Sequence, residues 1–225
     1  MFKLIKKIGH NLLDLIFPIE CLNCRAEGAY FCDTCLAKLQ FNDEATLDIL
    51  RANLRTPAIN QVFIAGNYED KLLQNLIIKY KYNFLQPLHR TLSSFLISAW
   101  KKIPQALILG GAYLVIPVPL VKKRLRWRGF NQAELLARDF SDYFKQTLCL
   151  DLKRKKPGKA QAELDEKTRL KNIEGVFNWS GGDLKEQTVL LIDDVITTGA
   201  TLNEAARILR ARGAKHIYAL VLAKG

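Results

Sequence analysis

The sequence predicts an α/β domain, a parallel sheet with flanking helices, that follows a small module rich in cysteine. Short apolar runs alternate with segments whose apolar residues recur at helical spacing, which favours strand-helix units. The runs at 113–118 and 189–192 are continuously apolar, as in strands that are covered on both faces. Four cysteines fall in two Cys-x-x-Cys pairs within residues 21–35. The length of 225 residues and the hydrophobic share of 49% allow one full domain plus a small module.

Residues 1–18 carry an amphipathic stripe that predicts a helix ending near Pro18. Asp14 interrupts the apolar run and no small-residue cleavage site follows, so we do not expect a secretory signal. No apolar run is long enough to span a bilayer. We therefore expect a cytoplasmic protein with no membrane insertion, whose first helix packs on the body of the protein. A membrane-surface or partner-docking role is the alternative for this stripe.

A metal-binding module is predicted over residues 19–45. Its candidate ligands are two pairs of thiols, Cys21, Cys24, Cys32 and Cys35. Each Cys-x-x-Cys turn aims two thiolates at one point, and two such turns complete the tetrahedral set that Zn²⁺ prefers. Four thiolates leave no open position, so we expect structural zinc, with two disulfides or an iron–sulfur cluster as the alternatives. Cys149 stands apart in an apolar context and is expected to be a small buried side chain.

The main domain is predicted over residues 58–225, and its middle carries a strongly basic segment. Strands are expected at Gln61–Tyr68 and Tyr113–Val118, with helices between them, and a further helix begins at Asn131. The segment Pro119–Arg128 is expected to be the loop that joins the second strand to this helix. So much positive charge in one strand-to-helix loop indicates an anionic ligand.

Ligands of open α/β sheets bind outside the carboxyl ends of the strands, so the basic segment and residues 193–201 are expected to border one site. Arg124 and Arg128 are the candidate contacts for phosphate oxygens, because Arg can grip phosphate with two hydrogen bonds. Lys81 is a further candidate. The alternative for the arginines is a simple basic surface, and for Lys81 a cation that complements the dipole at the end of a helix.

Residues 189–201 are the most informative stretch of the chain. An apolar strand over Val189–Ile192 leads into the carboxylates of Asp193 and Asp194, and a helix is expected to follow. The turn between strand and helix offers N–H groups, hydroxyls and the positive end of the helix dipole to an anion. The candidate phosphate-binding residues of this turn are Thr197, Thr198, Gly199, Ala200 and Thr201. Paired acids beside such a turn indicate a phosphorylated ribose, and the alternative is a capped helix with two chance aspartates.

A second basic segment, residues 153–175, is expected to be a mobile flap. The chain has 34 Lys and Arg against 22 Asp and Glu, a net charge of +12, so polyanionic partners are expected. The candidate DNA contacts open the flap and are Lys153, Arg154, Lys155 and Lys156. Covering a bound ligand is the other role of the flap. Trp127 and Phe130 offer faces on which single-stranded bases could stack, with packing as the commoner alternative.

Several motifs resemble known families. Residues 189–201 resemble the loop that binds 5-phosphoribosyl-1-pyrophosphate (PRPP) in the type I phosphoribosyltransferases. Residues 116–119 and 128–137, with Arg124 between them, resemble the central motif of the ComF family of competence-associated phosphoribosyltransferase-like proteins. Residues 80–82 and 175–177 are similar to further parts of its pattern.

The resemblance implies a type I phosphoribosyltransferase-like fold over 58–225, with a flexible hood at 153–175 and an N-terminal zinc module. It also implies PRPP with Mg²⁺ in the site. Asp193 and Asp194 would hold the ribose, the threonine turn the 5-phosphate, and the Pro119–Arg128 segment the pyrophosphate. Single-stranded DNA and a competence helicase are the implied partners.

We therefore expect a PRPP-binding protein that acts in the handling of single-stranded DNA during natural transformation. The first alternative is an active phosphoribosyltransferase, in which Asp193 and Asp194 orient the ribose while a nitrogen nucleophile, such as that of a nucleobase, displaces pyrophosphate. The second alternative is a zinc-stabilised scaffold with a vestigial pocket.

Overall fold

The computed structural model describes residues 18–43, 48, 51–52, 54–82, 85–103, 111–155 and 175–225. The chain divides into two compact units, Met1–Leu39 and Gln40–Gly225. The predicted N-terminal helix, up to residue 17, and residues 156–174 of the predicted hood lie outside the described residues. Within the described part of the chain, no helix has both the length and the apolar character that crossing a membrane requires.

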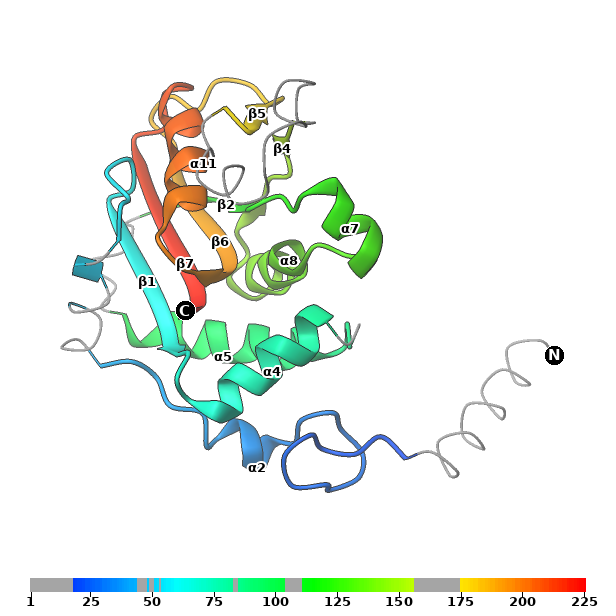
Figure 1. Cartoon of the computed structure of the whole chain (residues 1–225). Helices are drawn as coiled ribbons and strands as arrows, with labels where there is room; N and C mark the ends of the chain where they lie inside the picture. Colours follow the sequence, from blue (N-terminus) through cyan, green and yellow to red (C-terminus); the bar gives the residue numbers. More distant parts are fainter. Residues whose placement is uncertain are drawn as a thin grey trace. The chain divides into compact units, whose positions relative to one another are not determined.

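The larger unit is built on a sheet of five strands in the order β1-β7-β6-β2-β3 (Figure 1). These strands are β1 (Gln61–Asn67), β2 (Leu114–Pro117), β3 (Thr147–Leu148), β6 (Thr188–Ile196) and β7 (His216–Lys224). Each neighbouring pair runs parallel. A separate antiparallel pair consists of β4 (Leu152–Arg154) and β5 (Phe177–Trp179). The predicted α/β class with a parallel sheet is confirmed.

Among the described residues of the larger unit, five helices connect and flank these strands. They are α4 (Lys71–Tyr82), α5 (Leu88–Lys102), α7 (Lys122–Arg128), α8 (Gln132–Phe144) and α11 (Ala200–Arg210). Helix α5 follows Pro87, whose fixed φ suits the start of a helix. Helix α8 follows Asn131, as the sequence predicts. After α11, Gly213 has a φ of +92°, a left-handed conformation that glycine adopts readily after a helix.

One face of the sheet is covered by α11 together with the β4-β5 pair. Val189 and Leu191 of β6 belong to the same hydrophobic core as Leu209 of α11 and Phe177 of β5. Because successive side chains of a strand point to opposite faces, the buried Leu190 of β6 faces the other side of the sheet. The sheet is thus buried on both faces, which explains why its central strands are continuously apolar.

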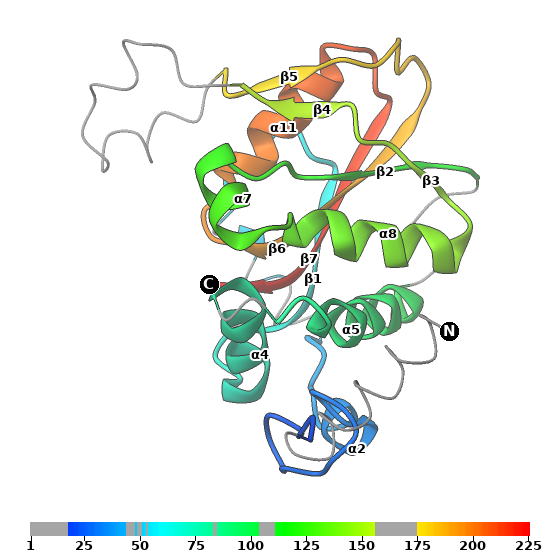
Figure 2. The ribbon, with the colours of Figure 1, turned by 90° about the vertical axis from the view of Figure 1, so that its right-hand side faces the viewer.

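The other face of the sheet is covered by α5 and α8, which lie side by side (Figure 2). Trp100 of α5 joins the layers, because its ring lies 5.3 Å from that of Phe63 on β1 and 5.6 Å from that of Phe140 on α8. Helix α4 packs against α5 in turn. This packing brings the end of α4 to the same side of the sheet as α8.

Candidate functional site

The site lies where β6 continues past the end of β2. Pro117, the last residue of β2, pairs with Ile192, and the Val118 N–H donates to the carbonyl oxygen of Ile192 at 2.9 Å. Beyond that point β6 pairs only with β7, through residues 193–196. The sequence predicted a strand that ends at Ile192, but pairing with β7 extends it to Ile196. Among the described residues, no strand therefore pairs with residues 193–196 of β6 on the side of β2.

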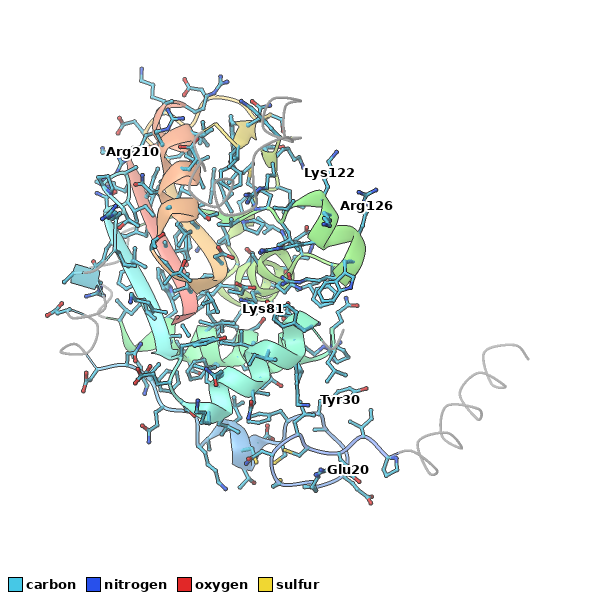
Figure 3. The ribbon with its side chains drawn as sticks, in the orientation of Figure 1. Glu20, Tyr30, Lys81, Lys122, Arg126 and Arg210 are labelled. Carbon is cyan, nitrogen blue, oxygen red and sulfur yellow. The ribbon has the colours of Figure 1, made fainter. Side chains whose placement is uncertain are left out.

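The two predicted acids lie in this extension, and both are half-buried. Asp193 Oδ1 accepts a hydrogen bond from the Asp194 N–H at 2.8 Å. Asp194 Oδ1 accepts one from the Val195 N–H at 2.6 Å and forms an ion pair with Lys81 Nζ at 2.9 Å. Lys81 comes from the last turn of α4 (Figure 3). The alternation of the strand thus sends Asp194 toward the side of α4 and Asp193 toward the side of α11.

The carboxyl of Asp193 has an unusual proton affinity. Its burial, and after it the charge of Asp194, raise the pKa of Asp193 to about 7, against the opposing effects of the Asp194 N–H, Lys81 and Arg154. When two carboxylates are adjacent in the chain and partly buried, ionising both of them has a high free-energy cost. Near neutral pH the Asp193 carboxyl can therefore exist with or without its proton, and can either donate to or accept from a hydroxyl.

The turn after β6 has a conformation that requires glycine. Gly199 precedes α11 with a φ of +82°, and a Cβ on it would lie 2.5 Å from Thr56 Cγ2. The Thr198 carbonyl oxygen accepts from the Arg55 N–H at 3.0 Å, and its Oγ1 accepts from the Ala200 N–H at 3.4 Å. In this turn Thr197 and Thr198 are exposed, Gly199 is buried, and Ala200 and Thr201 are half-buried. Thr197 and Thr198 are thus the residues of this turn that are most accessible to a ligand.

The basic segment after β2 contains a short helix, where the sequence predicted a loop. Helix α7 spans Lys122–Arg128, a run composed mainly of the good helix formers Lys, Arg and Leu. It ends at Gly129, whose φ is +78° and whose N–H donates to the Leu125 carbonyl oxygen at 2.8 Å. Because helical neighbours are four residues apart, Arg124 and Arg128 lie on the same side of α7.

These two arginines have different surroundings. Arg124 is exposed, whereas Arg128 is only 5% exposed. The Arg128 guanidinium donates from Nη1 to Gln132 Oε1 at 3.0 Å and lies 5.1 Å from the centre of the Tyr82 ring. Its Nε has no hydrogen-bond partner among the described residues. Of the two arginines predicted to bind phosphate, Arg124 is the accessible one, and Arg128 contributes mainly to packing between α7, α8 and α4.

Arg154 approaches the site from β4. Along this strand Lys153 is exposed, whereas the next side chain, Arg154, is half-buried and lies 5.2 Å from the centre of the Phe177 ring. Burial and the charge of Arg124 lower the pKa of Arg154, while Asp193 raises it. Arg154 is therefore electrostatically coupled to both sides of the site. The sequence grouped it with the DNA contacts, but the two-residue period of β4 turns it away from Lys153.

The ends of the predicted hood are held by hydrogen bonds that their backbone N–H groups donate. The Lys155 N–H donates to the Val176 carbonyl oxygen at 2.8 Å, and the Gly175 N–H donates to Glu204 Oε1 at 2.7 Å. Lys153 and Lys155 are exposed, and Lys156 lies outside the described residues.

Glu204 was not identified from the sequence, although it is an acid on the buried side of α11. Its carboxylate is 7% exposed and is paired with Arg207 at 2.8 Å. Burial opposes ionisation of Glu204, but hydrogen bonds from Arg207 and the Gly175 N–H lower its pKa. It therefore links the end of the hood to the helix that starts at the threonine turn.

In the smaller unit, the four predicted thiols gather at one point. Their sulfur atoms all lie within 4.8 Å of one another, and they belong to Cys21, Cys24, Cys32 and Cys35. The edge of a tetrahedral set of sulfurs around zinc is about 3.8 Å. Helix α2 (Asp33–Leu36) carries Cys35, which accepts a hydrogen bond at its sulfur from Asn23 Nδ2 at 3.2 Å. The cluster can therefore hold a metal ion.

Two thiols of this cluster, those of Cys21 and Cys24, have shifted pKa values. Burial works against ionisation of Cys21, but N–H groups of Cys24, Cys32 and Asn23 donate to its sulfur and lower its pKa to about 6. The Ala26 N–H lowers the pKa of Cys24, but the three other thiols outweigh it and raise that pKa to about 11. The thiol of Cys21 therefore loses its proton more readily than an ordinary cysteine, whereas the thiol of Cys24 holds its proton more firmly. Cys149 is half-buried and donates from its thiol to Asp151 Oδ2 at 3.5 Å.

Known proteins resemble this chain along most of its length. It is 32% identical over 209 residues to Competence protein F of Haemophilus influenzae, an alignment that covers 91% of this chain and 90% of that protein. The chain belongs to the competence protein F (ComF) family. The resemblance found in the sequence is thus confirmed. Residues 129–225 of this ComF protein match the model of the phosphoribosyl transferase domain, so α8, β6 and α11 lie inside the match while Lys81 and Arg124 lie outside it.

Two further relatives are similar over shorter stretches. The ComF chain is 36% identical over 105 residues to Competence protein ComFC of Bacillus subtilis, which covers 45% of this chain and 40% of that protein. It is 30% identical over 111 residues to DNA utilization protein YhgH of Escherichia coli O157:H7, which covers 49% of this chain and 48% of that protein.

The turn before α11 gives a first prediction. Gly199→Ala is expected to lower the free energy of unfolding by about 1 to 3 kcal/mol, because it adds both a left-handed alanine and a clash with Thr56. Urea unfolding measures this. Gly182→Ala, whose Cβ would meet nothing within 4 Å, is the control. Thr56→Ser removes Cγ2 and should recover part of the loss. An equal effect of both Gly→Ala changes would contradict this account.

The acid pair gives a second prediction, on pH. The folded state holds the Asp193 proton up to about pH 7, whereas the unfolded chain releases it near pH 4, so the folded state binds more protons in that window. The free energy of unfolding should therefore fall as pH rises across it. In the wild type this fall should amount to about 1 kcal/mol or more between the two ends of the window, and Asp193→Asn should remove it. Urea unfolding across the window tests this, with the exposed Asp183→Asn as the control, and parallel profiles for both variants would refute it.

Proposed function

We propose that this ComF protein binds PRPP where β6 extends past β2, and that it acts in the handling of single-stranded DNA during natural transformation. The observation that carries the proposal is an acid pair on the open edge of β6, followed directly by the start of α11. The names of its relatives, two competence proteins and a DNA utilization protein, support the biological role. The phosphoribosyl transferase match supports the ligand.

The proposed ligand has three parts, and each fits a different part of the site. Asp193 and Asp194 would accept hydrogen bonds from the ribose hydroxyls, and Lys81 would share Asp194 with the ligand. The N–H groups and hydroxyls of the 197–201 turn would hold the 5-phosphate. Carboxylate oxygens are the ligands that Mg²⁺ prefers, so the acid pair also suits a magnesium complex of PRPP.

The pyrophosphate part would lie among cations. Arg124 and Arg154 are close enough for one to lower the pKa of the other, so without an anion they repel. A pyrophosphate between them would relieve this repulsion, and Lys81 would add a third positive charge from α4. The buried Arg128 would support α7 from within and would not contact the ligand.

The raised pKa of Asp193 favours a second proposal, that the site turns PRPP over. A nitrogen nucleophile would form a bond to C1 of the ribose as the bond from C1 to the pyrophosphate oxygen breaks. The nitrogen then loses a proton, which a carboxylate with a pKa of about 7 can receive. The positive charges of Arg124 and Arg154 would stabilise the leaving group.

The metal, the DNA contacts, the protein partner and the location are further parts of the proposal. We propose that the four-cysteine cluster holds structural zinc, because its sulfurs alone complete a tetrahedral shell. Lys153 and Lys155, both exposed, are proposed to contact DNA phosphates, together with Lys156. A competence helicase as a partner and a cytoplasmic location complete the proposed function.

A calorimetric titration with PRPP and Mg²⁺ tests the ligand proposal. The wild-type protein is expected to bind PRPP. Changing Asp193→Asn together with Asp194→Asn should weaken binding by about tenfold or more, because hydrogen bonds to charged acceptors in a partly buried place are lost. The matched control changes Asp183→Asn and Glu186→Gln, two exposed acids, and so alters the net charge equally.

The outcomes separate the proposals. If the wild type shows no binding, the PRPP proposal fails. If the acid-pair variant binds as tightly as its control, the proposed role of Asp193 and Asp194 fails. Mass spectrometry of a nucleobase mixture incubated with PRPP then tests turnover, because ribosylated products that the acid-pair variant does not form would establish a transferase. Binding without such products would leave a PRPP-binding protein.

The metal proposal predicts one zinc per chain by elemental analysis. With zinc bound, only Cys149 should react with a thiol reagent, and a strong chelator should make the four cluster thiols reactive as well. The chelated smaller unit should lose its order, since structural zinc contributes on the order of 10 kcal/mol to folding. Thiols that appear only after reduction would show disulfides instead. Visible absorbance from iron would show an iron–sulfur cluster.

A further inference from the structure

Exposed hydrophobic side chains concentrate on two helices of the larger unit. Among the described residues, the large hydrophobic side chains exposed on α4 and α7 are Ile78, Tyr82, Leu125 and Trp127, and a fifth, Tyr143, lies on α8. Tyr82 is 51% exposed and Trp127 is 53% exposed. Large aromatic side chains are usually more buried than this, so rings left half in water on adjacent elements indicate a binding surface.

Tyr82 and Trp127 are neighbours, although they come from different helices. Their ring centres lie 6.0 Å apart, with an angle of 54° between the planes. The buried guanidinium of Arg128 lies 5.1 Å from the centre of the Tyr82 ring and is held by Gln132. Tyr82 is thus supported by a fixed group while half of its surface remains exposed. The pair forms a small apolar surface that does not depend on a mobile side chain.

Helix α7 has two sides with different surroundings. Arg124 and Arg128 share the side toward the ligand site and the protein interior. The other basic side chains of α7 are all exposed, and they are Lys122, Lys123 and Arg126. Lys123 and Trp127 are four residues apart, so a cation lies beside the exposed ring. Figure 3 shows Lys122 and Arg126 directed away from the body of the protein. Helix α7 contains no acid.

We propose that Tyr82, Trp127 and the exposed cations of α7 form a stacking platform for single-stranded DNA. Unpaired bases offer flat apolar faces to aromatic rings, and each nucleotide brings a phosphate that Lys or Arg can contact. In a duplex the base faces are already stacked on each other, so the platform favours a single strand. This proposal rests on the proposed role in DNA handling, because it names a surface that performs it.

The charge of the platform favours a nucleic acid over a protein. Lys122, Lys123 and Arg126 of α7 are exposed cations, and the last turn of α4 adds Lys79. Interfaces between proteins are depleted of Lys and of charged residues in general at their centre. The platform also borders the proposed PRPP site, since Lys81 precedes Tyr82 in the chain and Arg124 lies on the same helix as Trp127. A strand bound here would therefore pass beside the ligand.

Fluorescence anisotropy of a short labelled oligothymidine measures the stacking contribution. Tyr82→Ala with Trp127→Ala should weaken binding roughly tenfold or more, because stacking on two rings is lost. Trp127→Phe should retain most of the affinity, because a flat ring remains. Lys122→Ala with Arg126→Ala should reduce the slope of log affinity against log salt by roughly 1.4, the value for two phosphate contacts on a single strand.

Matched controls exist elsewhere on the same unit. Tyr143→Ala removes a ring that is also 51% exposed, but one that lies on α8 and is covered by Lys101 at 4.5 Å. Lys101→Ala with Lys102→Ala removes two exposed charges from α5. Neither control should change the affinity for DNA by as much as the platform variants. Because both altered rings are exposed and are not among the proposed PRPP contacts, urea unfolding should give a wild-type value for the variant Tyr82→Ala with Trp127→Ala, and the PRPP titration should serve as a check on its ligand site.

Each outcome decides the proposal. Loss of oligothymidine binding in the ring variant, with duplex binding and PRPP binding retained, supports the platform. Equal losses for single strand and duplex would overturn stacking as the mode of binding. If the ring variant binds like the wild type while Lys153→Ala with Lys155→Ala abolishes binding, the platform is wrong and DNA handling by the hood stands. If the wild type binds no DNA, both the platform and the DNA part of the proposed function fail.

Discussion

The register between β2 and β6 is the constraint on which the rest of the site depends. Because β2 ends opposite Ile192 while β6 continues to Ile196, the sheet has an open step at its carboxyl edge. Asp193 and Asp194 lie on that step, and the pleat sends their side chains to opposite faces. Each acid thereby meets cations from a different layer of the protein, Lys81 from α4 on one side and Arg154 from β4 on the other.

The charges around this step are close together but incompletely neutralised. Burial and mutual repulsion raise the pKa of Asp193, and the same kinds of effect lower that of Arg154. Such an arrangement costs stability unless a ligand completes it, which is typical of functional sites. Helix α7 extends the positive charge from the site to the surface, because its basic residues lie on more than one side of the helix. The proposed sites for a sugar phosphate and for DNA therefore lie on different sides of α7.

The sequence by itself determined the local features of this protein. The cysteine spacing predicted the cluster, since two Cys-x-x-Cys turns bring their thiols together whatever surrounds them. The apolar runs predicted a parallel sheet, and the acid pair with its threonine turn predicted that a helix follows, as α11 does. The family resemblance rested on the same contiguous motifs. These features depend on residues near one another in the chain, so a local pattern is sufficient to find them.

Only the tertiary structure decided how distant segments meet. The end of β6 depends on where its two neighbouring strands stop, and no property of residues 193–196 records that. Lys81 has an acid partner because α4 packs beside the sheet. Arg128 is buried because it packs against Gln132 of α8 and Tyr82 of α4, whereas Arg124 one turn earlier is accessible, so the arginines that the sequence treated as equal have different surroundings. Packing between layers assigns each side chain a neighbour, and that assignment is a property of the whole fold rather than of any segment.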